Sequence, residues 1–152
     1  MTETARVLLV AAVLAGSGFG LYVWRLLQIA PTEPARLIGE LRFAHWMALT
    51  LAAVGGAWIG LASGRPSQVL SGIDLTIAIA LIVTAAFTVQ RDVRGALTIL
   101  CLAFLTHAII DALHRPDWMA ADLAPRWFTL GCAAYNLFLS ALCYLVQRRE
   151  HA

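Results

Sequence analysis

The sequence predicts an all-α protein, a polytopic membrane helix bundle with five transmembrane helices, or four if one span lies at the interface. Hydrophobic residues make up 61% of the 152 residues and charged residues only 13%, and the mean hydropathy is +0.77. Soluble domains are about half apolar and about a quarter charged, and disordered chains are more polar still. The composition therefore places the chain in a lipid bilayer.

Five apolar runs have the roughly 20 residues that a helix needs to cross a bilayer. They cover about 7–29, 42–63, 69–89, 94–114 and 127–147, so residues 1–152 form one integral-membrane helical domain. Helix interiors disfavour proline, and all five prolines lie in the gaps between the runs: Pro31, Pro34, Pro66, Pro116 and Pro125.

The first and fourth runs need separate justification. The first continues through Phe19 to Trp24 with no cleavage site before a hydrophilic chain, so it indicates a retained helix rather than a signal peptide. The fourth is the weakest, because its uncharged part, 95–110, has about 16 residues. It crosses the membrane only if Asp111 lies within the protein or near the interface. The longest connection, 30–41, is expected at the surface.

The arginines predict the orientation, because arginine and lysine gather on the cytoplasmic side. Of the 11 basic residues, all arginine, seven fall on one side of a five-span topology and four on the other. This predicts an outside N-terminus and a cytoplasmic C-terminus in a bacterial-type inner membrane. The first side holds Arg25, Arg36, Arg42, Arg91, Arg94, Arg148 and Arg149, and the other holds Arg6, Arg65, Arg115 and Arg126.

Aromatic residues near the span ends are typical of the membrane interface. They are Trp24, Trp46, Trp118, Trp127 and Tyr144. The net charge of +2 is too small and too scattered to indicate a nucleic-acid partner.

Small residues recur every fourth position in the first two spans, at Ala12, Gly16 and Gly20 and at Gly56 and Gly60. This spacing lets helix backbones approach closely. Such a face packs either within the chain or against another protein, and we expect packing within the chain.

The strongest candidate site is the set His107, Asp111 and His114, which share one face of the fourth span because they are four and three residues apart. Asp74 starts the third span on the same side of the membrane and is expected to join them. These residues are a candidate site for a divalent metal such as zinc, or a proton relay. Simple pairing of His107 with Asp111, which neutralises two buried groups, is the favoured interpretation.

A second polar stripe follows one face of the fifth span, at Thr129, Cys132, Asn136 and Ser140, and continues to Cys143. Interhelical hydrogen bonding is the favoured interpretation. The alternative is one wall of a polar path beside the His/Asp set.

Other cofactors and activities find little support. His45 and His107 would differ in depth by roughly 12 Å at 1.5 Å per residue, so a shared haem is disfavoured. Three single cysteines, Cys101, Cys132 and Cys143, form no disulfide or zinc pattern.

The sequence thus favours a small non-catalytic membrane protein, an accessory subunit or helix-packing partner in a larger assembly. Its expected partners are the lipid bilayer and either another membrane protein or a second copy of the chain. One alternative is binding or translocation of a small cation or proton through the His/Asp set. The other is a metal-dependent membrane enzyme.

Overall fold

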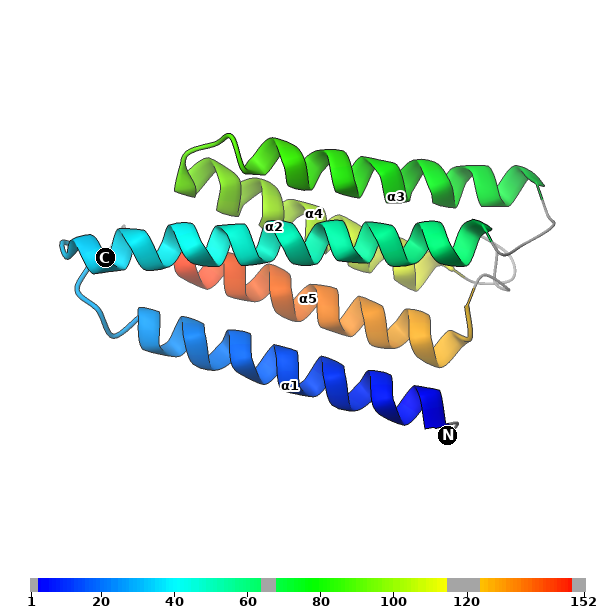
Figure 1. Cartoon of the computed structure of the whole chain (residues 1–152), viewed down its shortest axis with the longest axis horizontal. Helices are drawn as coiled ribbons and strands as arrows, with labels where there is room; N and C mark the ends of the chain where they lie inside the picture. Colours follow the sequence, from blue (N-terminus) through cyan, green and yellow to red (C-terminus); the bar gives the residue numbers. More distant parts are fainter. Residues whose placement is uncertain (1–2, 64–67, 115–123, 149–152) are drawn as a thin grey trace.

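The computed structural model describes residues 3–63, 68–114 and 124–148. These residues form five helices and no strand, which confirms the all-α bundle. Successive helices run in alternating directions along the long axis of the molecule (Figure 1). The helices are α1 (Glu3–Leu26), α2 (Pro34–Ser63), α3 (Gln68–Thr88), α4 (Val93–Leu113) and α5 (Arg126–Arg148).

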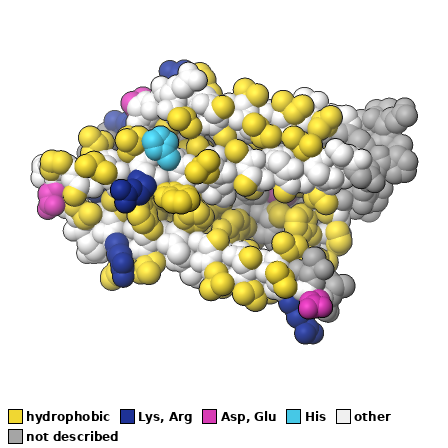
Figure 2. Space-filling view, viewed as in Figure 1, with side chains coloured by type: hydrophobic (Ala, Val, Ile, Leu, Met, Phe, Trp, Pro, Cys, Tyr) yellow, Lys and Arg dark blue, Asp and Glu magenta, His cyan; other side chains and the backbone are white. Residues whose placement is uncertain are grey.

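Four of these helices, α1, α2, α4 and α5, are long and apolar enough to cross a membrane. The apolar segment Gly72–Thr88 of α3 is shorter. The fourth expected span is therefore long and apolar enough to cross a membrane in spite of Asp111. The third expected span, α3, is the weaker candidate for a membrane crossing. Apolar side chains cover much of the surface (Figure 2). The chain is an integral membrane protein by the length and composition of its helices.

The expected connection at 30–41 is wrong from residue 34 onward, because α2 begins at Pro34. Proline is well tolerated at the first position of a helix, where its missing N–H has no intrahelical partner to lose. Residues 34–41 are consequently helical. Arg36 and Glu40, expected at the surface, are each only 4% exposed.

Two hydrogen bonds hold the end of α1 against the start of α2, and an ion pair within α2 engages the arginine that makes one of them. The Tyr22 hydroxyl donates to the Gly39 carbonyl oxygen at 3.0 Å. Arg36 donates from Nη1 to the Leu26 carbonyl oxygen at 2.6 Å and from Nε to Glu40. The guanidinium and the carboxylate thereby satisfy each other away from water.

The core lies between α2, α4 and α5, where α4 packs mainly on α5, and α2 packs mainly on α3. α1 is attached more loosely, since few of its side chains are buried, and it lies along the edge of the bundle (Figure 1). The largest fully buried hydrophobic side chains of the core are Phe43, Met47, Leu51, Leu97, Leu100, Phe104 and Leu139.

The two glycine ladders behave differently. A Cβ on Gly16 would lie 3.2 Å from the Tyr135 ring, and one on Gly20 would lie 3.7 Å from Phe138, so the α1 ladder packs on α5. A Cβ on Gly56 or Gly60 would meet no described atom within 4 Å. Both glycines are exposed. The expectation of packing within the chain is therefore wrong for α2, whose inward face carries Gly55 instead.

The aromatic residues named for the interface are exposed where the structure describes them, at Trp24, Trp46, Trp127 and Tyr144. Trp118, Pro66, Pro116 and three arginines used for the orientation, Arg65, Arg115 and Arg149, lie outside the described residues. The orientation and the inner-membrane location remain predictions.

Candidate functional site

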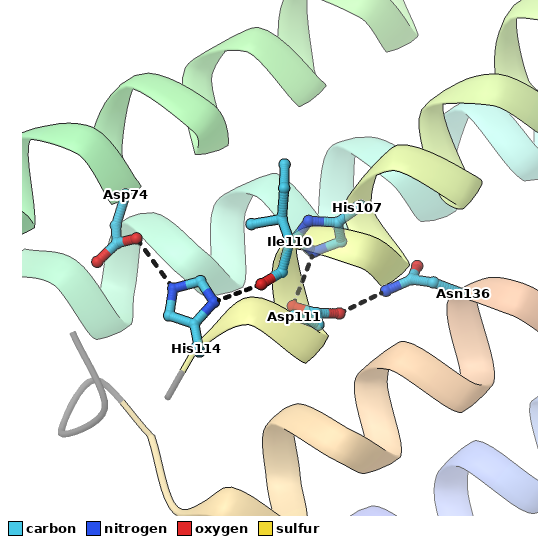
Figure 3. A network of polar contacts seen from close by, with 6 residues as sticks. All are labelled: Asp74, His107, Ile110, Asp111, His114 and Asn136. Carbon is cyan, nitrogen blue, oxygen red and sulfur yellow. Dashed lines mark hydrogen bonds and ion pairs between the residues drawn. The ribbon is translucent and has the colours of Figure 1, made fainter. Parts of the chain in front are cut away.

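The predicted site residues lie in the interior of the bundle, toward the end where α3 begins and α4 ends (Figure 3). His107 and Asp111 lie on one face of α4, and His114 directly follows its last residue; the three are 0%, 1% and 6% exposed. Asp74, from the start of α3, is 1% exposed, and Asn136 of α5 is 2% exposed. Three helices therefore contribute polar side chains to one buried region, which we call the His/Asp network.

The structure brings Asp74 and His114 into direct contact. Nε2 of His114 lies 3.1 Å from Oδ1 of Asp74, and Nδ1 lies 2.9 Å from the carbonyl oxygen of Ile110. A carbonyl oxygen can only accept, so Nδ1 carries a hydrogen. Nε2 and Asp74 then share a second hydrogen. The pair is either an imidazolium beside a carboxylate or a neutral ring beside a carboxylic acid.

His107 and Asp111 face each other less closely. Nε2 of His107 lies 3.7 Å from Oδ1 of Asp111, which is beyond hydrogen-bond length. The other oxygen of Asp111 accepts a hydrogen bond from Nδ2 of Asn136 at 3.0 Å. Asn136 thus fixes the carboxyl group, whereas the imidazole of His107 is held by packing.

The polar groups of this network are incompletely satisfied. Among the described residues, five buried side-chain atoms have no hydrogen-bond partner, and all five belong to this network. A buried polar atom without a partner costs about 1–3 kcal/mol. The atoms are Asp74 Oδ2, Nδ1 and Nε2 of His107, Asp111 Oδ1 and Asn136 Oδ1.

The ring of Trp58, on α2, packs against both histidines, and the sequence did not predict this contact. Its ring centroid lies 5.5 Å from that of His107 in an edge-to-face arrangement and 4.9 Å from that of His114. Trp58 is 3% exposed, unlike the tryptophans at the interface. In the sequence nothing distinguishes Trp58 from any other aromatic residue in an apolar span.

The metal role assigned to His107, Asp111, His114 and Asp74 remains a prediction. The described part of the chain holds no group of three or more His, Cys, Asp or Glu side chains that could hold a metal ion. His114 directs Nδ1 to the Ile110 carbonyl oxygen and Nε2 to Asp74, whereas a metal needs a ring nitrogen with a free lone pair. The geometry is that of two His–Asp pairs.

The stripe on α5 faces α4 and forms hydrogen bonds between the two helices. In addition to the bond from Asn136, the Ser140 hydroxyl donates to the Cys101 carbonyl oxygen at 2.9 Å. Thr129, 2% exposed, donates to the Arg126 carbonyl oxygen within its own helix. Cys132 is partly buried and Cys143 fully buried, both as free thiols. His45 is exposed on α2.

The fold and this network define a class of protein, a helical integral membrane protein with a buried His/Asp network. Comparison adds no narrower group, because the chain matches no protein family, no curated protein and no solved structure.

Proposed function

We propose that the protein binds and exchanges protons at the His/Asp network within the membrane. The observation that carries this proposal is the concentration of unpartnered buried atoms in the network, five among the described residues. Ionisable groups inside a membrane are costly and usually mark a functional pathway. Polar atoms without a hydrogen-bond partner add a cost to helix packing, which apolar or hydrogen-bonded side chains avoid.

The chemistry of the pairs supports the proposal. The Asp74–His114 contact holds one shared hydrogen, which either partner can carry. His107 is the second imidazole, and its two nitrogens have no hydrogen-bond partner in the described residues. Histidine is the side chain whose ordinary titration falls near neutral pH. Two imidazoles beside two carboxyl groups are therefore suited to accept and release protons.

Trp58 provides a direct experiment, because an imidazolium quenches indole fluorescence more strongly than a neutral imidazole does. Tryptophan fluorescence of the full chain in nanodiscs would be titrated across about pH 3 to 8, a range that covers buried as well as exposed histidines, for the wild type and for Trp58→Phe. The difference between the two curves reports the rings that contact Trp58. We expect the tryptophan fluorescence of the wild type to change with pH. Trp58→Phe should remove this change, and His107→Gln or His114→Gln should alter it.

His45→Gln is the matched control, because His45 is exposed on the same helix as Trp58. His45→Gln should leave the pH-dependent change in fluorescence as it is in the wild type. Proton flux into liposomes loaded with a pH dye then tests exchange, with Asp111→Asn as the variant expected to lose flux. A Trp58 component that does not respond to pH, or equal flux with and without the protein, would contradict the proposal.

A second candidate function, that of accessory subunit or helix-packing partner, rests on the outward face of α2. Ala53, Gly56, Ala57 and Gly60 are exposed there at a spacing that favours close contact between membrane helices. Gly56→Leu together with Gly60→Leu should dissociate a homo-oligomer or release a co-purifying membrane protein. Ala11→Leu together with Ala15→Leu, at two exposed positions of α1, is the control. An unchanged mass in detergent would count against this role.

A further inference from the structure

An open groove separates the first half of α1 from the first half of α5. Its volume is about 600 Å³, within the range of small-molecule sites. The surface in Figure 2 is hollowed between α1, at the bottom of the view, and the rest of the bundle. The walls include Leu8, Leu9 and Val13 of α1 and Phe128 and Phe138 of α5.

The composition of the walls restricts the guest. None of the described lining residues carries a charge, and Ser17, Cys132, Tyr135 and Asn136 are among the few that offer polar atoms. Both helices that form the walls are long and apolar enough to cross the bilayer. A guest therefore arrives from the lipid phase, is mostly apolar and has no charged head.

Asn136 gives the groove one specific polar point. It lines the groove and is 2% exposed. Its Nδ2 donates to Asp111, and its Oδ1 has no partner among the described residues. An amide oxygen is an acceptor only. The complementary group on a guest is therefore a neutral hydrogen-bond donor, and a hydroxyl is the smallest such group that a mostly apolar molecule carries.

We propose that this groove binds a hydroxyl-bearing lipid, with the apolar body between α1 and α5 and the hydroxyl donating to Asn136. A membrane-spanning helix does not fit, because one helical turn 5.4 Å long and 10–12 Å wide fills roughly 400–600 Å³. The inference goes beyond the proposed proton exchange.

Photolabelling of the full chain in nanodiscs tests the site. The probe is a long-chain primary alcohol with a diazirine in its chain, and labelled peptides are identified by mass spectrometry. We expect labelling on the walls, residues 5–17 and 127–138. Unlabelled dodecanol should compete about tenfold better than its methyl ether, the value of one hydrogen bond in a buried site.

Two variants make the test specific. Gly131 lines the groove, and a Cβ there meets no described atom within 4 Å, so Gly131→Leu should fill the groove and abolish labelling. Gly18→Leu is the matched control, because Gly18 has the same open space on α1 but lies outside the lining residues. Asn136→Leu should retain labelling and lose the preference for the alcohol over the ether.

Equal competition by the alcohol and the ether would overturn the assigned ligand class. Labelling spread over all exposed apolar faces, unchanged in Gly131→Leu, would overturn the site. Neither readout involves protons, so either result is independent of the Trp58 titration. The site and the proton exchange can therefore fail separately.

Discussion

Gly55 of α2 lies directly against the backbone of Ala78 of α3. A Cβ on Gly55 would be 2.7 Å from the Ala78 carbonyl oxygen, closer than any side chain allows. Trp58 lies three residues after Gly55, and Asp74 lies four residues before Ala78. One turn of each helix therefore separates this close approach from the His/Asp network. The absence of a side chain at Gly55 brings Trp58 and Asp74 into range of the α4 histidines.

We expect Gly55→Ala to destabilise the protein and to weaken the network. The added methyl group meets the backbone oxygen of Ala78 and a carbon of Ile82 at 2.8 Å, so the two helices must move apart. Such overpacking costs about 1–3 kcal/mol. Thermal unfolding in detergent measures the loss. Gly56→Ala is the control, since its Cβ meets open space in the described structure, and an equal loss in both variants would contradict the argument.

The Asp74–His114 pair should show energetic coupling. Asp74→Ala and His114→Ala each leave a buried partner uncompensated, which costs about 3–5 kcal/mol if that partner is charged. The double variant should lose less than the sum of the two, by about 0.5–3 kcal/mol. A double-mutant cycle on free energies of unfolding from SDS titration measures this coupling, and strict additivity would show that the pair does not interact.

Asn136→Leu should destabilise the packing of α4 on α5. The change removes the donor to Asp111 and leaves a buried carboxyl group with one fewer partner, at a cost of about 1–3 kcal/mol. The same SDS titration applies. Leu137→Ala is the control, because Leu137 is 50% exposed on the adjacent position of α5. We expect it to change the free energy of unfolding by much less than Asn136→Leu does.

The contact between α1 and α2 should depend on Arg36 and Glu40 together. Arg36→Ala leaves the Glu40 carboxylate buried without its cation and frees the Leu26 carbonyl oxygen. Loss of one partner of a buried pair costs about 3–5 kcal/mol. Limited proteolysis in the 27–33 connection should accelerate. Arg36→Leu combined with Glu40→Leu should recover part of the loss. Arg42→Ala, at an exposed arginine, should have no effect.

Hydropathy predicted the existence of the helices because a bilayer requires long apolar runs, but it misplaced the start of α2. Proline served as a sign of a gap, whereas Pro34 occupies the first helical position. Hydropathy also treats all faces of a helix alike. It therefore did not reveal that Gly55 faces inward while Gly56 and Gly60 face outward.

The sequence predicts those site residues whose spacing along one helix places them on a shared face, as for His107, Asp111 and His114. Residues contributed by other helices were harder to place. Asp74 was inferred from topology, and Asn136 was identified only as a member of the polar stripe on the fifth span. Trp58 was missed because an apolar aromatic residue in an apolar span carries no local signal. The buried Arg36–Glu40 pair had a signal, the spacing of four residues, that was overlooked.

The distribution of the network over α3, α4 and α5 has a consequence for synthesis in the cell. Asn136 follows Asp111 by 25 residues along the chain. At about 5–20 residues per second, Asp111 waits roughly one to five seconds for its donor. During that interval α4 carries an acidic residue that disfavours its insertion. Asp74, by contrast, belongs to α3, which is made before His114, so His114 has its partner as soon as it is made. Efficient insertion of α4 therefore depends on the helix made before it, and its retention depends on the helix made after it.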